Sequence, residues 1–395
     1  MHSFLDTIPY AGITRIRDLM YAVERPFRLD QGDVSFDAPE TFKAGMRTAI
    51  NTNQSHYLAT SGLPHLRQLL MEKLARRNGI PINDREDVLV ANGGVHAMYL
   101  ACQALLDPGD EVLLPDPAWP ASRNNILAAR AIPVTYPLHE VRRWRFDIDE
   151  VAARVTPRTK ALYLNSPNNP TGGVLTRDDI EAAAALARER DLWVIADEAY
   201  EDVVFDGSSH PCIAALPGMY ERTIPICTFS KTYAVTGLRL GYLAVRNKAL
   251  RERILKLLFL TTSNVSSVIQ HGGIAALEGA QDVIEEYRRE LQARRDLFYA
   301  GIAEAAGHLF SGTPPLGAFY AFLRINPAWE PPAGSRTDSR SWAMVEHLIA
   351  RGRVGCVPGV DFGPTGEHYV RFCFARDRAE LQGALASMRE VFGDH

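Results

Sequence analysis

The sequence predicts an α/β protein with a large domain, in which helices cover both faces of a mostly parallel central sheet, and a smaller α+β domain. The chain has 395 residues, a length that favours two domains over one small core. From about residue 85 to residue 246, short β-rich runs alternate with Ala- and Leu-rich helical runs. Continuous apolar strands that alternate with helices are typical of a parallel sheet buried on both faces. After about residue 280 this alternation stops.

Seven strand segments make up the predicted sheet, and each ends near Gly, Pro, Asn or Asp. We expect the strands at residues 87–91, 111–114, 132–136, 160–165, 192–196, 223–228 and 240–245. Helices are expected between them at residues 95–106, 119–129 and 177–190.

The region after residue 280 predicts the smaller domain. We expect a long charged helix at 281–307, a strand at 317–322, a Pro- and Gly-rich surface loop at 326–334, a helix near 341–350, strands near Val354 and Tyr369, and a last helix at 378–392. The expected division of the chain is an N-terminal arm with part of the small domain at 1–44, the large domain at 45–285 and the small C-terminal domain at 286–395.

Composition narrows the class of protein. The 46% hydrophobic and 23% charged residues fit a globular chain, and the net charge of −4 gives no basic footprint for nucleic acid or for a membrane surface. The five cysteines show no CxxC pair and no metal-ligand spacing, so we expect small buried hydrophobes in a reducing compartment. The N-terminus lacks a signal-peptide pattern, and no apolar run approaches the roughly 20 residues that cross a bilayer. These observations predict a cytoplasmic protein without a metal site.

Lys231 is the most informative candidate. It follows the predicted strand at 223–228 and stands next to Ser230, near Thr228, with Arg239 eight residues later. A neutral lysine amine can form an imine with an aldehyde, while hydroxyls and a guanidinium can hold a phosphate. The pattern therefore suggests a Schiff-base site for a phosphorylated aldehyde cofactor, although a single lysine is more often a solvated surface charge.

Two further segments follow strands. Gly93 and Gly94 precede Val95 at the start of a predicted helix, where backbone amides can face an anion, although a plain strand-to-helix turn would look the same. The spacing matches neither a dinucleotide fingerprint nor a P-loop. Trp119 stands among prolines at a strand exit, where an indole can stack on a flat ring or simply fill the core.

The strand ends at 160–165 and 192–196 also carry polar residues. The rigid turn at 166–172 contains Asn168 and Asn169, either of which can donate to a phenolate-like oxygen or a carboxylate, or merely shape the turn. Asp197 and Tyr200 come next, and a buried carboxylate such as Asp197 needs a partner, for which a protonated pyridine nitrogen or a helix N-terminus would serve.

Arg371 lies in an apolar strand and should have a carboxylate partner, either an internal acid or the α-carboxylate of a substrate. The main argument is the clustering of these candidates. Ligands of parallel sheets bind at the carboxyl ends of the strands, and polar residues follow five of the predicted strands there.

Together these segments resemble the class I/II aminotransferases, the fold-type I enzymes that depend on pyridoxal 5'-phosphate. The resemblance extends from Gly32 to Arg371 with the motifs in family order. They include Gly32, Tyr57 before Gly62-Leu63-Pro64, Gly93-Gly94, Trp119, Asn169-Pro170-Thr171-Gly172, Asp197 to Tyr200, Ser230-Lys231, Arg239-Leu240-Gly241 and Val370-Arg371.

The resemblance implies a role for each matching residue. Lys231 would anchor the cofactor as an aldimine and carry a proton on the way to the ketimine, as an amino group passes from an L-amino acid to a 2-oxo acid. Asp197 would pair with the pyridine nitrogen, Tyr200 and Asn169 with the ring oxygen O3', and Trp119 would stack on the ring. Gly93, Gly94, Val95, Thr228, Ser230 and Arg239 would surround the phosphate. Gly32, Asn169 and Arg371 would bind the substrate, and Tyr57 would reach the phosphate of a partner subunit in a homodimer.

Two departures concern the substrate. Val95 stands where the bacterial branch that uses dicarboxylates often has lysine, and residues 261–267 contain no arginine for a distal carboxylate. Both put a preference for aspartate or glutamate in doubt. The same site could also serve a lyase, a cyclising synthase or an oxidase that acts on an amino acid. A regulator that kept the fold without catalysis would carry an added DNA-binding segment, which we do not see before residue 28.

Overall fold

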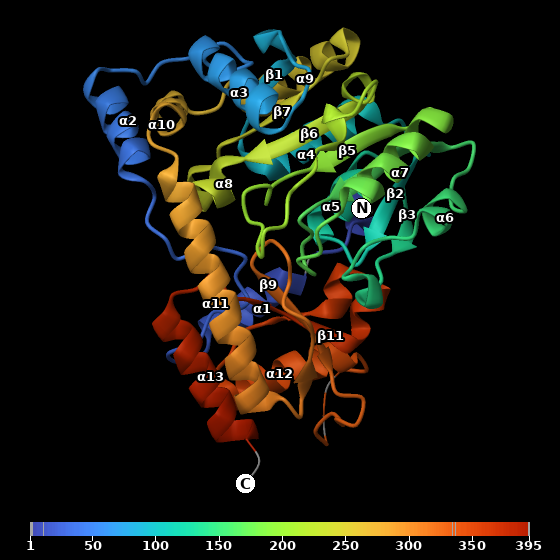
Figure 1. Ribbon diagram of the computed structural model, residues 1–395, viewed down its shortest axis with the longest axis vertical. Helices are drawn as coiled ribbons and strands as arrows, with labels where there is room; N and C mark the ends of the chain where they lie inside the picture. The colour runs from blue at the N-terminus through green and yellow to red at the C-terminus, as the bar shows by residue number, and fades with distance from the viewer. Residues whose placement is uncertain (1–2, 11, 334, 336, 394–395) are drawn as a thin grey trace.

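The computed structural model describes residues 3–10, 12–333, 335 and 337–393. Its larger sheet has seven strands in the order β1-β7-β6-β5-β4-β2-β3 (Figure 1). Only β7 runs antiparallel to its neighbours, so the predicted mostly parallel sheet is confirmed. The strands are β1 Val88–Ala91, β2 Glu111–Asp116, β3 Ile132–Pro137, β4 Thr159–Asn165, β5 Trp193–Asp197, β6 Thr223–Thr228 and β7 Gly241–Ala244.

Helices cover both faces of this sheet, as predicted. Along β1, Leu89 and Ala91 pack with helices α4, α5 and α9, whereas Val88 and Val90 pack with α3 on the opposite face. This alternation arises because successive side chains of a strand point to opposite faces. The α-helices of this part are α2 Glu40–Asn51, α3 Pro64–Arg77, α4 Gly93–Leu105, α5 Pro120–Ala128, α6 Ile148–Ala152, α7 Arg177–Glu189, α8 Phe229–Thr232, α9 Lys248–Thr262 and α10 Ser267–Glu278.

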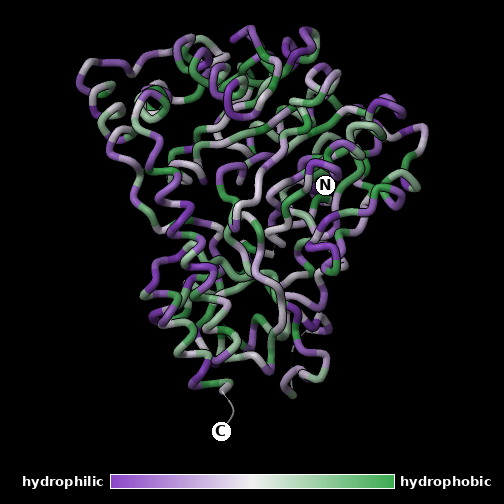
Figure 2. The backbone as a smooth tube through the Cα atoms, viewed as in Figure 1, coloured by the Kyte–Doolittle hydropathy of each residue, from purple (hydrophilic) through white to green (hydrophobic). Residues whose placement is uncertain are grey.

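A second, antiparallel sheet forms the smaller part of the molecule, with the order β10-β11-β9-β8. Its strands are β8 Phe310–Ser311, β9 Tyr320–Ile325, β10 Val357–Pro358 and β11 Tyr369–Cys373. The helices packed with it are α1 Gly12–Tyr21, α11 Asp282–Ala306, α12 Arg340–Gly352 and α13 Arg378–Phe392. The long α11 connects the two parts of the molecule, and hydrophilic and hydrophobic stretches alternate along the outer helices (Figures 1 and 2). The domain boundaries after residues 44 and 285 stay a prediction.

Short 3₁₀ helices complete the described structure. They are Phe4–Thr7, Arg85–Asp87, Glu140–Arg142, Ile213–Ala215, Tyr220–Arg222, Thr236–Leu238, Gly359–Phe362 and Pro364–His368. Within the residues that the structure describes, no helix is both long enough and apolar enough to cross a membrane. The five cysteines are buried and free, which agrees with their expected role as small buried hydrophobes.

Two strand predictions in the smaller part need correction. The strand expected at 317–322 begins only at Tyr320, because Ala318 has a φ of 55°, a left-handed conformation that a strand cannot contain. The strand expected near Val354 begins at Val357, and Val354 itself forms an isolated bridge with Phe27. In the expected loop at 326–334, the residues up to 333 form no helix or strand, and Gly334 lies outside the described residues.

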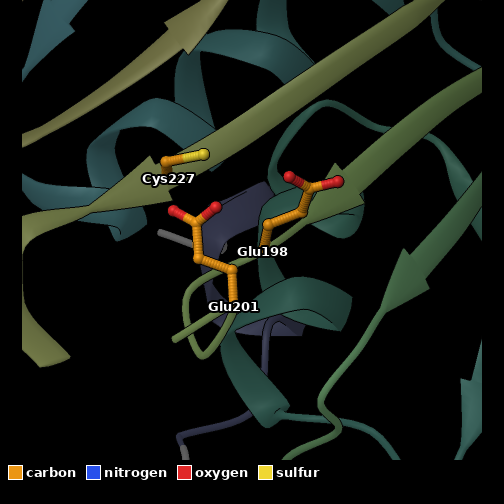
Figure 3. Close-up of side chains that lie close together, drawn as sticks. All are labelled: Glu198, Glu201 and Cys227. Atoms are coloured by element: carbon orange, nitrogen blue, oxygen red, sulfur yellow. The ribbon is translucent and has the colours of Figure 1, made fainter. Parts of the chain in front are cut away.

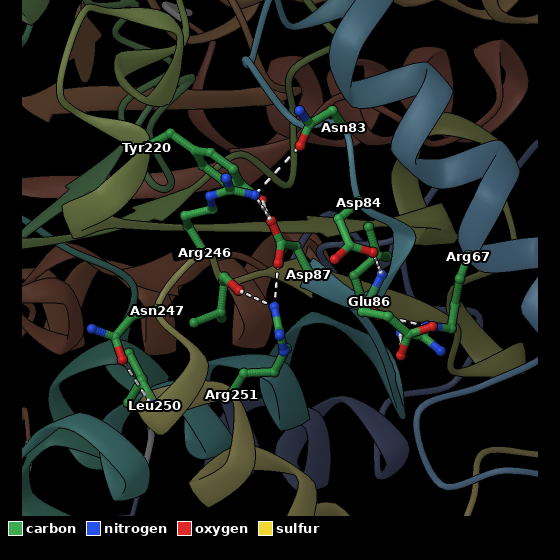
Figure 4. Close-up of polar contacts among 12 residues, drawn as sticks. Arg67, Asn83, Asp84, Glu86, Asp87, Tyr220, Arg246, Asn247, Leu250 and Arg251 are labelled. Carbon is green, nitrogen blue, oxygen red and sulfur yellow. Dashed lines mark hydrogen bonds and ion pairs between the residues drawn. The ribbon is translucent and has the colours of Figure 1, made fainter.

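A buried ionic cluster of Asp87, Tyr220, Arg246 and Arg251 connects the edge strand β1 with the segment between β7 and α9 (Figure 4). Asp87 directly precedes β1 and is 1% exposed. Its carboxylate accepts hydrogen bonds from the Tyr220 hydroxyl at 3.1 Å and from Arg246 Nη1 at 3.3 Å, and it also pairs with Arg251 of α9. A buried carboxylate needs such partners, so this cluster stabilises the edge of the sheet.

Candidate functional site

A cavity of about 230 Å³ lies where the strands of the large sheet end and the smaller sheet begins. It is lined by all of the predicted site residues except Gly93 and Tyr57. The further lining residues, which the sequence did not single out, are Ile13, Asn165, Ala199, Thr236 and Tyr320. The expectation that the polar strand ends meet at one edge of the sheet is therefore confirmed.

Lys231 enters the cavity from α8, the short helix that follows β6. Its Nζ donates a hydrogen bond of 2.6 Å to the carbonyl oxygen of Gly32. Burial lowers the pKa of Lys231 to about 8, against the opposing effect of Asp33. An amine with this pKa is partly neutral near pH 8, and only a neutral amine can act as a nucleophile or accept a proton.

Asp197 ends β5, directly beside Asn165 at the end of β4. Its Oδ2 accepts a hydrogen bond of 2.9 Å from the Tyr163 hydroxyl, and its Oδ1 accepts one of 3.2 Å from the backbone amide of Ala199. Burial raises the pKa of Asp197 to about 6, although these hydrogen bonds oppose that effect. No helix begins at Asp197, so its carboxylate caps a turn and remains available to a cationic partner in the cavity.

The turn after β4 separates the roles of its two asparagines. Asn168 shapes the turn, because its Oδ1 accepts hydrogen bonds from the Thr171 amide and hydroxyl at 3.3 and 2.8 Å. Asn169 instead faces the cavity and accepts a hydrogen bond of 3.1 Å from Arg371 Nη1. The backbone amide of Asn169 is held by the side chain of Asn165 at 2.9 Å.

Arg371 lies in the middle of β11 and is 1% exposed. Its Nη2 donates to the carbonyl oxygen of Asp30 at 2.8 Å, while its buried Nε has no hydrogen-bond partner in the described part of the chain. No carboxylate among the described residues forms an ion pair with it. Of the two partners that the sequence allowed, a substrate carboxylate therefore fits better than an internal acid.

The start of α4 and the loop after β6 form a cradle for an anion. Gly93, with a φ of +80°, does not line the cavity, but a Cβ there would lie 2.5 Å from Arg239 Nη2. The glycine therefore lets the guanidinium approach the N-terminus of α4, where backbone amides and the helix dipole favour negative charge. Thr228 and Ser230 add hydroxyls, which are 3.0 Å apart.

Three predicted residues differ in how they relate to the cavity. Trp119 lies at the N-terminus of α5, half-buried, and forms part of the wall. Gly32 contributes its carbonyl oxygen to the amine of Lys231. Tyr57 is 91% exposed and does not line the cavity of this chain.

Two tyrosines were missed by sequence reasoning. Tyr163 lies inside β4, and Tyr320 begins β9. The only signal in the sequence is that each tyrosine interrupts an apolar run, and a buried hydroxyl needs a hydrogen-bond partner. That signal does not identify the partner, which is Asp197 at the end of β5 for Tyr163 and Tyr200 in the following turn for Tyr320.

Glu198, Glu201 and Cys227, which do not line the cavity, lie close together and have atoms that could ligate a metal (Figure 3). Lys73 Nζ, however, donates to Glu201 Oε1 at 2.6 Å, and Asn78 Nδ2 donates to Glu201 Oε2 at 2.6 Å. Burial acts to lower the pKa of Lys73, yet the charge of Glu201 raises it overall. The ammonium thus supplies the positive charge that the Glu201 carboxylate needs.

Comparison with known proteins identifies the family of this fold. The family described as aminotransferase class I and II matches residues 24–388. An aspartate aminotransferase of Pyrococcus abyssi is 35% identical over 99% of this chain and 98% of the relative. An aromatic-amino-acid aminotransferase of Thermococcus litoralis is 34% identical over 98% of this chain and 97% of the relative. The crystal structure of an aromatic aminotransferase from Pyrococcus horikoshii has a TM-score of 0.86 at 35% identity and covers 95% of this chain and 98% of that one.

The fold and the cavity define a fold-type I enzyme that depends on pyridoxal 5'-phosphate. The chain belongs to the class I and II aminotransferase family. It is a pyridoxal-phosphate-dependent aminotransferase, which moves an amino group between an amino acid and a 2-oxo acid. The names of its relatives do not favour a lyase, a cyclising synthase or an oxidase.

The residues of the cavity fit this cofactor. The group requires an amine, an anion site for its phosphate and a counter-charge for its ring nitrogen, and the cavity contains a lysine amine, the cradle at α4 and the Asp197 carboxylate. Asp197 also has the chemistry of a partner for a cation, because its carboxylate is buried and, among the described residues, pairs with no basic side chain.

Proposed function

We propose that Lys231 both anchors the cofactor and carries the proton that leaves the substrate. The observation that supports this most is the buried amine of Lys231, with its pKa lowered to about 8, in the cavity where the strand ends meet. When bound, pyridoxal 5'-phosphate supplies an electron sink that makes the Cα proton of an amino acid removable. The neutral amine can then accept this proton at its Nζ and release it again.

The other cavity residues would hold and tune the cofactor. Asp197 would pair with the ring nitrogen, and Tyr200 and Asn169 would face the ring oxygen O3'. Trp119 would cover the ring. The phosphate would be held by Gly93, Gly94, Val95, Thr228, Ser230 and Arg239. This assignment is supported by the hydroxyls, amides and guanidinium gathered at the N-terminus of α4, which together can bind a phosphate.

Arg371, with Gly32 and Asn169 beside it, would bind the α-carboxylate of the substrate. The buried Nε without a partner supports this role, since a carboxylate would satisfy it. Asn169 already accepts a hydrogen bond from the same guanidinium and so helps to orient it.

The preferred amino acid would have an uncharged side chain. Lys231, Arg239 and Arg371 are the cations that line the cavity in the described chain, and each already has a proposed role. The remaining wall includes Ile13, Val95 and Trp119, which favour apolar or aromatic groups over a second carboxylate. Among the relatives, this preference agrees with the name of the aromatic-amino-acid aminotransferase rather than with that of the aspartate aminotransferase.

We further propose a cytoplasmic homodimer in which Tyr57 contacts the cofactor phosphate of the partner subunit. The 91% exposure of Tyr57 supports this, because a large aromatic side chain on the surface gains most from burial in an interface. The cytoplasmic location rests on the five buried free cysteines.

Two experiments test the reaction and the role of Lys231. Purified enzyme is incubated with a panel of amino acids without a 2-oxo acid. Stoichiometric conversion of the cofactor to its amine form is expected for transamination, whereas catalytic release of ammonia or uptake of O₂ would contradict it. In the second experiment, Lys231→Ala should fold and lose both the visible absorbance of the attached cofactor and turnover. Undiminished turnover would refute the assignment.

A further inference from the structure

Tyr320 contacts three residues of the proposed site, one assigned to the cofactor and two to the substrate carboxylate. It begins β9, lines the cavity and is 1% exposed. Its hydroxyl lies 2.8 Å from the hydroxyl of Tyr200, and the guanidinium of Arg371 lies 4.4 Å from the centre of its ring. The hydroxyl also packs on Gly32, where a Cβ would lie 2.5 Å from it.

The two hydroxyls have only one proton each to donate. Burial raises the pKa of Tyr200 and of Tyr320, so both phenols are neutral in the physiological range. Tyr200 is the one hydrogen-bond partner of the Tyr320 hydroxyl in the described part of the chain. When Tyr320 donates its proton to the Tyr200 oxygen, the proton of Tyr200 remains free for a group in the cavity. Hydrogen bonds in such a chain strengthen one another, because each donor is polarised by the bond that it accepts.

The ring of Tyr320 contacts the arginine proposed to bind the substrate carboxylate. The Arg371 guanidinium lies over its face, a geometry that attracts a cation to an aromatic ring. Arg371 is also fixed by Asn169 and by the carbonyl oxygen of Asp30. The Phe362 ring lies 5.0 Å from the same guanidinium, so the two rings and the two acceptors together hold it in one plane, with the Tyr320 ring as the nearer.

We propose that Tyr320 is a positioning residue with two separable tasks: its hydroxyl directs the proton of Tyr200 to the ring oxygen of the bound cofactor, and its ring holds Arg371 for the substrate carboxylate. The proposal rests on the proposed roles of Tyr200 and Arg371. Neither task requires Tyr320 to contact the reacting atoms. The residue instead couples the side that holds the cofactor to the side that binds the carboxylate.

The test uses the cofactor-loaded enzyme and three variants. Tyr320→Phe removes the hydroxyl and keeps the ring, whereas Tyr320→Leu removes both, with Tyr320→Met in its place if the leucine variant does not fold. Tyr220→Phe is the matched control, because Tyr220 is also 1% exposed and loses one hydrogen bond, of 3.1 Å to Asp87, far from the cavity lining. Turnover, the pH titration of the visible cofactor absorbance, and the Kd of 3-phenylpropanoate, a carboxylate without an amine, are measured for each.

For Tyr320→Phe we expect kcat to fall about tenfold with KM and the Kd of 3-phenylpropanoate nearly unchanged, as for the loss of one hydrogen bond between neutral groups. The midpoint of the absorbance titration should move to higher pH, because the negative charge on the ring oxygen loses part of its stabilisation. The titratable and charged groups that face Tyr200 and Tyr320 are Asp33, Asp197, Lys231, Arg371 and Cys373, and all are unaltered in this variant. Tyr320→Leu should in addition weaken 3-phenylpropanoate binding about tenfold, through the lost contact with Arg371.

Two outcomes would overturn the proposal. The hydroxyl task is ruled out if Tyr320→Phe has no more effect on kcat and on the absorbance midpoint than Tyr220→Phe. It is also ruled out if Tyr320→Phe keeps its full effect in a Tyr200→Phe background. Equal Kd values for the phenylalanine and leucine variants would rule out the ring task. Failure of the proposed function itself is distinguishable, because Tyr200→Phe alone would then leave the absorbance titration unchanged and Arg371→Lys would leave the Kd unchanged.

Discussion

The hydroxyl of Tyr163 donates a hydrogen bond of 2.9 Å to Oδ2 of Asp197, and the two residues lie on the neighbouring parallel strands β4 and β5. Tyr163 is fully buried, and burial raises its pKa well above the usual value, so its hydroxyl keeps its proton. The carboxylate is thus fixed by one donor from the sheet and one from the Ala199 amide. The proposed counter-charge for the cofactor ring is thus held in place by the protein itself.

Tyr163→Phe should lower kcat/KM about tenfold to a hundredfold, because a hydrogen bond to a charged group contributes about 1.5–3 kcal/mol. Removal of the hydroxyl also raises the pKa of Asp197 further and weakens its pairing with a ring nitrogen. Steady-state kinetics with the best amino acid donor, together with cofactor dissociation, check this. Tyr136→Phe is the control, since its hydroxyl donates to the backbone of Tyr163 at 3.0 Å and not to Asp197. Equal effects of the two substitutions would contradict the role of Tyr163.

Without cofactor, the stability of the protein should depend on Asp197 and on pH. The carboxyl has a pKa of about 6 in the fold, against about 4 in an unfolded chain. Because the folded state binds this proton more tightly, the stabilising contribution is full below about pH 4 and is lost as the pH rises through about 6. Asp197→Asn avoids this loss. The free energy of unfolding of the cofactor-free variant should therefore exceed that of the parent by up to about 3 kcal/mol at pH 8 and differ little from it below pH 4. Urea unfolding at several pH values measures the difference, and a constant gap would contradict the prediction.

Val95→Lys should shift the substrate preference toward dicarboxylates. Val95 lies in the first turn of α4, lines the cavity and is 41% exposed, so a lysine there can reach the cavity without burial of its charge. We expect kcat/KM for aspartate to rise about tenfold relative to phenylalanine, as an added charge-assisted contact permits. Val141→Lys, on a side chain 95% exposed, makes the same change of charge outside the cavity and should leave the ratio unchanged. An unchanged ratio in both variants would rule out Val95 as a determinant.

Asp87→Ala should destabilise the protein by about 3 kcal/mol, because it leaves Arg251, which has a side chain 16% exposed, without its carboxylate. The matched control is Asp191→Ala. Asp191 pairs with Arg222 at 2.9 Å, but its side chain is 94% exposed, and such pairs contribute about 0–1 kcal/mol. Urea unfolding compares the two. A loss no larger for Asp87 than for Asp191 would show that the cluster of Figure 4 does not stabilise the sheet edge.

Most of the large sheet could be predicted from local patterns, because its strands are continuous apolar runs and its helices are Ala- and Leu-rich. The strands of the smaller sheet were harder to predict from the sequence. β8 has two residues and no pattern of its own, and the start of β9 depends on the backbone conformation of Ala318, which is held by a hydrogen bond of 2.9 Å from its amide to Val203. A contact between residues so far apart in the chain leaves no periodic signal.

The candidate site also has features that the sequence predicts and features that it does not. The order of motifs and the strand-end positions of Asn169, Asp197 and Lys231 follow from the sequence, since parallel strands bring their carboxyl ends to one edge. The sequence does not show which hydrogen-bond donor contacts which of these side chains. Tyr163 reaches Asp197 through the register of β4 and β5, whereas Tyr320 of the smaller sheet reaches Arg371 on the neighbouring strand β11 and Tyr200 in the turn after β5 of the larger sheet.

By itself the sequence determined the type of fold and the class of cofactor chemistry, and it supplied the residues proposed to carry that chemistry, because these depend on local patterns and on which side chains stand at strand ends. Only the tertiary structure decided the state of these side chains. The lowered pKa of Lys231 and the raised pKa of Asp197 both come from burial, which several separate segments create together. The free Nε of Arg371 and the paired hydroxyls of Tyr200 and Tyr320 likewise exist only where the two sheets meet.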